Sequence, residues 1–424
     1  MNKAEKKHLL IYAHYYIPDV ASTGQIVKEL AEGMLDTFQI TIICVVPSYG
    51  GVVEEEYKKQ RFYYETIHGV DVIRIRVPEF TKADKVSRVK NIVSYFFGAM
   101  HATVKVKNVD YVFSISQPPV LGGLLGVWGK WTKRASFIYN IQDFNPEQIL
   151  AVNYSRNKLV TNSMMFFDKF SCKQSDLIIT VGRDLVETVN QRFQNKKVPK
   201  TVMINNWIDE QEIYPLEESH EKIQEFKRRY HLENKFIIMY SGNLGLYYDL
   251  ENILKVIEQF KPDTKTKEGK EVCFVFVGAG TVQHKLEKYV QEHQMSNVVF
   301  IPYQKKEDLI FSLNAADVHW VVNAKGIKGV SCPSKYYGVA AIASPVLGVL
   351  EQDTEIRSII EETQSGLVVE PGDYQKIKSH IQWFIDHAGS KELKEMGKRG
   401  REHLVQNLTR NLSIQKYKEE ILKL

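Results

Sequence analysis

The chain has 424 residues, of which 44% are hydrophobic and 25% charged, the balance of a soluble globular protein long enough for two domains. No apolar run reaches the roughly 18 residues that cross a bilayer, and four dispersed cysteines without a CxxC pair argue against a disulfide scaffold or a structural zinc. The opening MNKAEKKHLLIYA passes from charge straight into a short strand, so we expect no signal peptide and a cytoplasmic protein.

The first half of the chain alternates short runs rich in Val and Ile with longer amphipathic segments. This alternation predicts a parallel sheet covered by helices. The apolar stretch 118–129 is too short to span a membrane and is interpreted as a buried helix. The predicted strands are 8–13, 40–46, 70–76, 110–116, 136–142, 176–181 and 200–205.

A polar segment that begins at Asn205 interrupts this alternation, which then restarts. We therefore predict an α/β protein of two Rossmann-like, doubly wound domains, 1–206 and 235–408, that face a cleft. Residues 207–234 would be the linker, and a C-terminal helix over 409–424 would cross back onto the first domain. Ligands collect at the carboxyl ends of parallel strands in such folds. The later predicted strands are 236–242, 272–278, 298–303, 317–322, 344–350 and 365–372.

The charge is unevenly distributed, with 27 Lys and Arg against 19 Asp and Glu in residues 1–200. Much of the excess lies in segment 82–107, where basic residues flank Tyr95, Phe96 and Phe97. A basic helix with an aromatic face is typical of binding to an anionic membrane surface, and we predict that partner. The alternative is an aromatic stripe that faces the core, with solvated lysines around it.

Two segments of the second half run from an apolar strand through small residues into a helix. They are YSGNLG, at 240–245, and GVSCPSKYYG, at 329–338. Such turns aim backbone N–H groups at one point and suit the diphosphate of a nucleotide, to which a lysine adds a compact cation. A solvated surface lysine is the alternative. The candidate diphosphate ligands are Asn243, Gly245, Ser334 and Lys335.

Taken in order, the motifs resemble those of a known family. The chain is similar to the family 4 glycosyltransferases of GT-B architecture, and within them to bacterial polysaccharide enzymes of the fucosamine-transferase type. The resemblance covers nearly the whole chain. It rests on HYYIPDVASTGQIVKELAEGM, IQDFNPE and INNWID in the first half, and on YSGNLG, FVGAG, VVFIPYQKKEDL, AADVHWVV, CPSKYYG and SGLVVEPGD in the second.

The resemblance implies a function. A sugar, in this type an N-acetylated amino sugar, would pass with retention from a UDP-sugar to a lipid-linked oligosaccharide in capsule or O-antigen synthesis. The enzyme would be peripheral at the inner face of the plasma membrane. No Asp-x-Asp motif stands in a convincing place, so we expect no metal and no cofactor.

The resemblance also assigns residues. His14 and Asp143 follow predicted strands and could orient or deprotonate the acceptor hydroxyl. In retaining enzymes of this architecture the leaving diphosphate itself is thought to take that proton, so the main catalytic work falls to charge stabilisation by Lys335. The remaining assignments are Thr23 and Gly24 to the diphosphate, Gly278, Gly280, Pro302, Tyr303 and Leu309 to the nucleotide, and Glu147 and Glu355 to the sugar or acceptor.

The sequence departs from the family pattern in two places. An Arg and a Lys of many members are replaced by Asn243 and Tyr248, and two glutamates by Val330 and Gly338. These losses keep open a non-catalytic assembly partner, and the shared architecture keeps open a UDP-sugar 2-epimerase. The basic segment and the PSKYYG and NNWID motifs favour the transferase.

Overall fold

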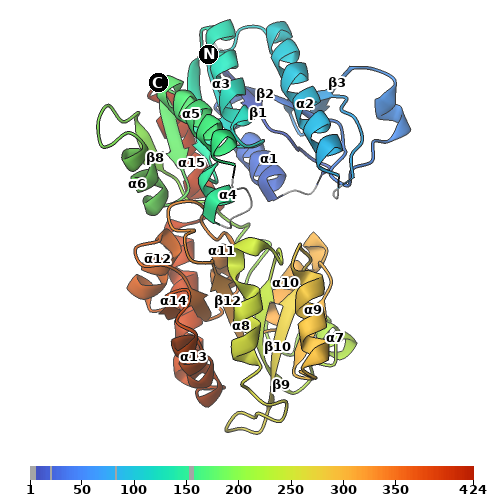
Figure 1. Cartoon of the computed structure of the whole chain (residues 1–424), viewed down its shortest axis with the longest axis vertical. Helices are drawn as coiled ribbons and strands as arrows, with labels where there is room; N and C mark the ends of the chain where they lie inside the picture. The colour runs from blue at the N-terminus through green and yellow to red at the C-terminus, as the bar shows by residue number, and fades with distance from the viewer. Residues whose placement is uncertain (1–5, 20–21, 82–83, 152–156) are drawn as a thin grey trace. The chain divides into compact units, whose positions relative to one another are not determined.

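The computed structural model describes residues 6–19, 22–81, 84–151 and 157–424 (Figure 1). It divides into two compact units. The first unit is Met1–Asn205 together with Asn411–Leu424, and the second unit is Asn206–Arg410. No helix in the described ranges is long and apolar enough to cross a bilayer.

The first unit is built on an eight-stranded sheet in the order β3-β4-β2-β1-β5-β6-β7-β8. All neighbours are parallel except the edge strand β3, which pairs antiparallel with β4. The strand order reverses between β1 and β5, a topological switch point at which the loops leaving both strands diverge. The strands are β1 (Lys7–Tyr12), β2 (Phe38–Val45), β3 (Phe62–Ile67), β4 (Val70–Ile75), β5 (Tyr111–Ile115), β6 (Ser136–Ile141), β7 (Leu177–Thr180) and β8 (Thr201–Met203).

Two helices of the first unit begin at a residue whose side chain caps the helix. Asp84 accepts hydrogen bonds from the first backbone N–H groups of α2, and Asn157 does the same for α5. The apolar stretch 118–129 forms α3, as predicted, and a Cβ at Gly126 would overlap the ring of Phe137, so the glycine lets α3 approach β6 closely. The helices are α1 (Ser22–Met34), α2 (Lys85–Lys105), α3 (Leu121–Lys133), α4 (Glu147–Ala151), α5 (Lys158–Gln174) and α6 (Arg183–Arg192).

The C-terminal helix α15 (Arg410–Leu422) packs into the first unit. Figure 1 shows it, in dark red, among the green and cyan elements of that unit. Its Tyr417 is buried, lies 6.1 Å from Phe113 between ring centroids, and accepts a 2.9 Å hydrogen bond from Asn140 Nδ2. This last helix therefore completes a core that is formed mainly by the start of the chain.

The second unit holds a six-stranded, all-parallel sheet in the order β11-β10-β9-β12-β13-β14. Both faces of the sheet are buried, since alternate residues of β9 enter separate core clusters, Ile238 in one and Ile237 in another. The order reverses between β9 and β12, the switch point of this unit. The strands are β9 (Lys235–Ser241), β10 (Glu271–Val277), β11 (Val298–Ile301), β12 (Val318–Val322), β13 (Val346–Val349) and β14 (Gly366–Val369).

The segment that we expected to be a linker, 207–234, lies within the second unit. It contains α7 (Glu221–Arg229), whose Ile223 and Phe226 are buried in the core beside β9. Its polar composition misled the prediction, because a short helix needs few apolar residues to dock. The other helices of the unit are α8 (Leu250–Ile257), α9 (Gln283–Glu292), α10 (Leu309–Asn314), α11 (Lys335–Ala341), α12 (Glu355–Thr363), α13 (Tyr374–Asp386) and α14 (Lys391–Asn407).

Candidate active site

The two predicted diphosphate turns of the second unit follow β9 and β12, the strands on either side of its switch point. The structure brings the two turns into contact. A Cβ at Gly242, in the turn after β9, would overlap the side chain of Lys335 at the start of α11. Gly242 also has a φ of 146°, which side chains other than hydrogen rarely tolerate. The lysine side chain therefore lies along a stretch of backbone that only glycine can provide.

Lys335 is a partly buried cation at the start of α11. Its Nζ lies 3.8 Å from the ring centroid of Tyr248 and 5.2 Å from that of Tyr240, and no carboxylate among the described residues is within ion-pair distance of it. Burial lowers the pKa of Lys335 to about 7. Aromatic ring faces compensate an ammonium only in part, so this site favours the arrival of a negatively charged group.

The loops after β9 and β10 are locked together by their backbones. Leu244 N donates a 2.9 Å hydrogen bond to Ala279 O. A Cβ at Gly278 would overlap the carbonyl oxygen of Gly242, and one at Gly280 would overlap that of Leu244. The predicted role of Gly278 and Gly280 was to let a nucleotide approach. The structure shows that both glycines allow the two loops to pack closely.

Asn243 and Ser334 are exposed beside Lys335. The carbonyl oxygen of Asn243 accepts a 2.7 Å hydrogen bond from Tyr240 Oη, which fixes the turn that continues into Gly245. Ser334 occupies the N-cap position of α11, but its hydroxyl makes no capping hydrogen bond. The polar groups of both side chains therefore lie at the surface next to the unpaired cation.

The predicted nucleotide residues after β11 lie at the same edge of the sheet, two strands from β9. Pro302 is exposed, and the side chain of Tyr303 is 68% exposed. The carbonyl of Pro302 already accepts a 2.7 Å hydrogen bond from Gln304 Nε2. Leu309, the first residue of α10, is partly buried against the core, so Tyr303 offers the larger accessible surface to a base.

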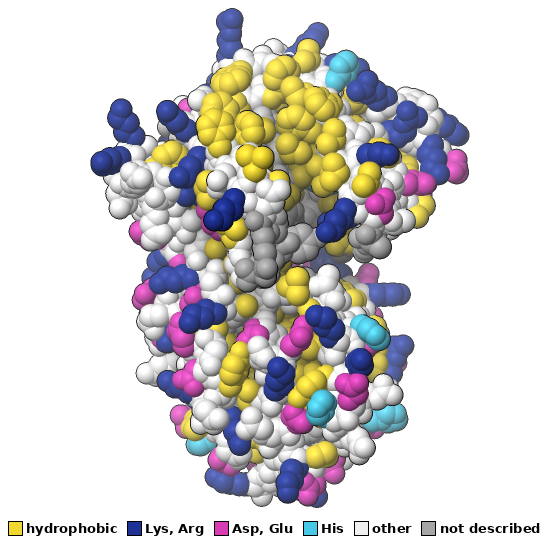
Figure 2. All heavy atoms as spheres, viewed as in Figure 1, with side chains coloured by type: hydrophobic (Ala, Val, Ile, Leu, Met, Phe, Trp, Pro, Cys, Tyr) yellow, Lys and Arg dark blue, Asp and Glu magenta, His cyan; other side chains and the backbone are white. Residues whose placement is uncertain are grey.

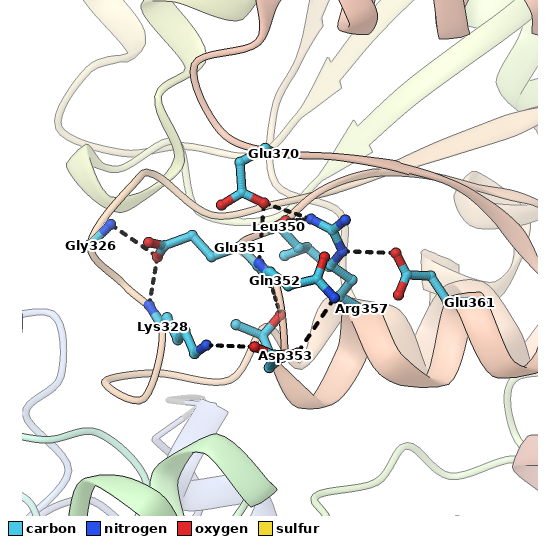
Figure 3. A network of polar contacts seen from close by, with 10 residues as sticks. Gly326, Lys328, Leu350, Glu351, Gln352, Asp353, Arg357, Glu361 and Glu370 are labelled. Carbon is cyan, nitrogen blue, oxygen red and sulfur yellow. Dashed lines mark hydrogen bonds and ion pairs between the residues drawn. The ribbon is translucent and has the colours of Figure 1, made fainter. Parts of the chain in front are cut away.

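The loop between β12 and α11 is held by acidic residues that the sequence analysis did not single out. Glu351 Oε2, from the loop after β13, accepts hydrogen bonds from Gly326 N at 2.9 Å and from Lys328 N at 2.8 Å (Figure 3). Lys328 Nζ in turn pairs with Asp353 Oδ2 at 3.2 Å. Glu351 thus fixes the segment that leads to Lys335. Its position just after a strand was the only signal in the sequence.

The surroundings of the missing family glutamates are apolar. Val330 is buried, and a Cβ at Gly338 would lie 3.5 Å from Leu313 Cδ1 and 3.6 Å from Ile208 Cδ1. A carboxylate at either position would lose its hydration without gaining a partner. Glu355, predicted to contact the sugar or acceptor, is buried at the first position of α12. Its carboxylate is therefore part of the interior of the second unit.

In the first unit, His14 follows β1 at the switch point. Its ring lies 4.8 Å from that of Tyr95 and 4.3 Å from that of Tyr15, measured between centroids. Burial lowers the pKa of His14 to about 4, so the imidazole is neutral at pH 7. Its Nε2 is buried and has no hydrogen-bond partner among the described residues. Gly24 lies in the first turn of α1, while the side chain of Thr23 lies outside the described residues.

Asp143 and Glu147 follow β6, separated from β1 by β5. Glu147 forms a two-pronged ion pair with Arg192, with N–O distances of 2.8 and 2.7 Å, and Arg192 also pairs with the buried Asp168. Arg192 Nη2 further donates to Asn145 O at 3.2 Å. Glu147 therefore anchors the loop that carries Asp143, and the predicted sugar contact gains no support from its position. Sequence analysis missed Arg192, which lies 45 residues further along the chain.

Comparison with known proteins shows which family the chain resembles. Residues 222–403, nearly all of the second unit, match the family described as Glycosyl transferases group 1. The probable glycosyltransferase WbjE of Pseudomonas aeruginosa is 25% identical over 360 residues, which cover 82% of this chain and 83% of WbjE. The chain is thus similar to a glycosyltransferase along most of its length. The putative colanic acid biosynthesis glycosyl transferase WcaI of Escherichia coli K12 is 21% identical over 376 residues, covering 85% of this chain and 87% of WcaI.

Solved structures share the fold of this chain at low sequence identity. Sucrose-phosphate synthase from Thermosynechococcus elongatus superposes with a TM-score of 0.76 at 14% identity over 99% of both chains. Anabaena HepE, solved in complex with UDP, has a TM-score of 0.68 at 13% identity, over 98% of this chain and all of that one. The predicted fold class, two parallel α/β domains of GT-B type, is confirmed.

The described part of the chain contains no cluster of three or more His, Cys, Asp or Glu arranged to hold a metal ion. The positive charge that a metal would bring to a diphosphate has one clear protein counterpart at the switch point of the second unit, the ammonium of Lys335. Lys335, Asn243, Gly245 and Ser334 are therefore the predicted residues that the structure brings together.

Proposed function

We propose that the chain is a glycosyltransferase that moves a sugar from a UDP-sugar to a lipid-linked saccharide during synthesis of a bacterial surface polysaccharide, with retention of anomeric configuration. The observation that carries the donor half is the unpaired ammonium of Lys335 at the switch point of the second unit. Neighbours of the same fold were solved with UDP and with UDP-glucose, which favours a uridine nucleotide. WcaI, a relative along most of the chain, is named for colanic acid biosynthesis, which favours a polysaccharide product.

In this reaction the main role of the second unit would be to stabilise negative charge on the departing UDP. As the bond between the anomeric carbon and the phosphate oxygen breaks, charge develops on the departing UDP, and Lys335 is positioned to balance it. The acceptor oxygen forms the new bond on the same face, and its proton passes to the departing phosphate. No strong protein base is needed in this scheme.

The acceptor half of the proposal is assigned to the first unit. His14 is neutral at pH 7, and its buried Nε2 has no hydrogen-bond partner among the described residues, so a rotation of the ring toward the surface would let it accept a hydrogen bond from an acceptor hydroxyl. Asp143 lies in the loop before Glu147, and Arg192 holds the end of this loop by its ion pair with Glu147. The sugar that fits the fucosamine-transferase resemblance is an N-acetylated amino sugar, and the proposal includes independence from metal ions.

A specific observation favours one competing function. Val330 and Gly338 stand where members of the resembled family carry glutamates, and their surroundings here are apolar. The loss of these two carboxylates would be expected in a non-catalytic relative that serves in assembly. Such a protein would retain the fold, including the core of the second unit, but would not bind a UDP-sugar.

A thermal-shift screen separates the two functions. The chain is mixed, in the presence of EDTA, with UDP, GDP, ADP, UDP-glucose and UDP-N-acetylglucosamine. A ligand at 100 times its dissociation constant should stabilise the fold by about 2.7 kcal/mol. We expect stabilisation by the uridine nucleotides alone, its loss in Lys335→Met, and its retention in the exposed-lysine control Lys261→Met. No shift with any nucleotide would support the assembly partner.

A further inference from the structure

Helices α2, α3 and α5 lie side by side on one face of the first unit, with α3 in the middle (Figure 1). Their outer surface is unusually apolar for a protein surface exposed to water. Figure 2 shows hydrophobic side chains gathered over this part of the first unit, whereas the second unit shows mixed charges in the same view. We call this surface the α2–α3–α5 face.

On α2 the exposed apolar residues form a stripe separate from the one that packs on the sheet. Val86, Val89, Val93, Phe97 and Val104 are all exposed, and Phe97 is 59% exposed. Their spacing of three, four and seven residues places them on one side of the helix. The predicted aromatic face is therefore divided, since Tyr95 is buried in the core and Phe97 is not. Residues 82–83 of the predicted basic segment lie outside the described ranges.

The structure adds two helices that the sequence analysis did not include. On α5, Leu159 is 77% and Phe166 is 66% exposed, and Phe167 lies next to Phe166 at 5.4 Å between ring centroids. On α3, Trp131 is 57% exposed. The ring of Trp131 lies 6.1 Å from that of Phe170 of α5, which joins the two helices into one apolar surface.

The charge that the three helices carry is almost all positive, although Lys130 pairs with Asp176 beyond the end of α5 at 2.7 Å. The three helices together carry nine Lys and Arg and a single acidic residue, Asp168. Asp168 is buried and paired with Arg192, so it contributes nothing to the surface. The helices therefore present apolar side chains among cations with no exposed carboxylate of their own. The cations are Lys85, Arg88, Lys90, Lys105, Lys130, Lys133, Lys158, Lys169 and Lys173.

We propose that the α2–α3–α5 face docks on an anionic phospholipid surface, with Phe97, Trp131 and Phe166 inserted among the headgroups. Cations among the apolar side chains match negative headgroups, each worth about 1 kcal/mol near such a surface. A second copy of the chain fits less well, because a symmetric contact through this face would oppose like charges. The inference deepens the proposed function, since it brings the enzyme to a lipid-linked acceptor, but it does not depend on the donor site.

The test is co-sedimentation of the full chain with large vesicles of phosphatidylcholine, or of equal parts phosphatidylcholine and phosphatidylglycerol. We expect binding to the anionic vesicles only, weakened by high salt. The double variants Phe166→Ser/Phe167→Ser and Val89→Ser/Phe97→Ser should each bind about tenfold more weakly, since each removes two apolar anchors. The matched control Val52→Ser/Val405→Ser, exposed residues outside this face, should bind as the wild type does.

Intrinsic fluorescence reports the depth of insertion. Trp131 should shift its emission to shorter wavelength when anionic vesicles are added, and the shift should be absent in Trp131→Phe. Equal binding of the wild type and both double variants would overturn the inference. So would a lipid-free dimer that the same substitutions dissociate, because a second copy would then cover the face.

Failure of this inference is distinguishable from failure of the proposed function. The substitutions on the α2–α3–α5 face should leave the UDP-induced thermal shift unchanged, because they lie in the first unit, whereas Lys335 lies in the second. Vesicle binding without any nucleotide effect would overturn the donor proposal and leave the membrane inference standing. A nucleotide effect without vesicle binding would do the reverse.

Discussion

The proposed donor binding depends mainly on one side chain, that of Lys335. Its ammonium lies over the ring of Tyr248, at a position where many members of the resembled family carry a lysine. The pKa of Lys335 falls to about 7 because burial disfavours the charged form. A lysine in this state is only half protonated at neutral pH. A bound diphosphate would raise its pKa again, so ligand and proton bind together.

This coupling predicts a pH dependence of UDP binding. Above pH 7 the free enzyme loses the Lys335 proton that the complex keeps, so the affinity for UDP should fall with rising pH, by up to about tenfold per pH unit. Isothermal titration of UDP across this range measures the slope. Lys335→Arg, whose side chain stays charged, should remove the slope and keep binding, which separates the effect from titration of UDP itself. A slope that survives in Lys335→Arg would contradict the assignment.

His14 predicts a pH dependence of stability in the first unit. Its pKa is lowered from 6.5 to about 4 by burial. Between these values the unfolded chain binds a proton that the folded chain does not, so stability falls as the pH drops from 6.5 toward 4 and is unaffected above 6.5. In urea unfolding measured over this range, His14→Gln should lose less stability than the wild type. The exposed His101→Gln is the control, and equal losses in both variants would contradict the prediction.

At the scale of elements, the site depends on how two loops fit together. Gly280→Ala would place a methyl group onto the carbonyl oxygen of Leu244 and force apart the loops after β9 and β10. We expect a destabilisation of about 2 kcal/mol or more and loss of UDP binding. Gly338→Ala, whose new methyl meets only ordinary contacts in α11, should be neutral or slightly stabilising because alanine favours helix. Thermal unfolding with and without UDP compares the two variants.

Arg192 plays the corresponding part in the first unit. It joins the end of α6 to the loop after β6 through Glu147 and Asn145 O, and to α5 through Asp168. Arg192→Met would leave the carboxylate of Asp168 buried without its partner, and we expect a loss of about 3 kcal/mol. Chemical denaturation followed by circular dichroism measures it, with the exposed Lys196→Met as control. If Asp168→Asn in addition restores stability, the cost lies in the unpaired charge.

The elements themselves were largely predictable from the sequence. Strands buried on both faces appear as continuous Val- and Ile-rich runs, and every predicted run corresponds to a strand of the structure. The edge strand β3 was missed because FYYETI has one solvated face and pairs antiparallel, so no continuous apolar run marks it. Helix α7 was missed because only its Ile223 and Phe226 carry the packing.

The site was predictable only where a motif is local. Ser334 and Lys335 are adjacent to the start of α11, and the turn before Gly245 is continuous in sequence, so their chemistry could be inferred from spacing. The contacts that set the charge or the position of each site residue join segments that are far apart in the sequence. The rings under Lys335, the hold of Glu351 on Gly326, and the pairing of Glu147 with Arg192 all join distant segments. Such pairings follow from strand order, which periodicity does not specify.

At the scale of the whole molecule, the two units differ in how the chain builds them. The second unit is one continuous segment, Asn206–Arg410, whereas the first depends on the return of α15. Tyr417 packs on Phe113 inside the first unit, and Asn205 Nδ2 donates a 3.0 Å hydrogen bond to Ser413 Oγ. Loss of α15 would expose the apolar side of the first unit that it covers and leave buried polar groups unpaired.

A chain that ends at Arg410 tests this asymmetry. The first unit of this shortened chain should no longer unfold cooperatively. Removal of the buried Tyr417 and its buried neighbours should cost more free energy than the about 5–15 kcal/mol by which a typical domain is stable. The second unit should still fold and show the UDP-induced thermal shift, since all the residues around Lys335 lie within it. The single variant Tyr417→Ala should reproduce a milder form of the same effect. If truncation abolishes the response to UDP in a second unit that circular dichroism shows to be folded, donor binding requires the first unit as well.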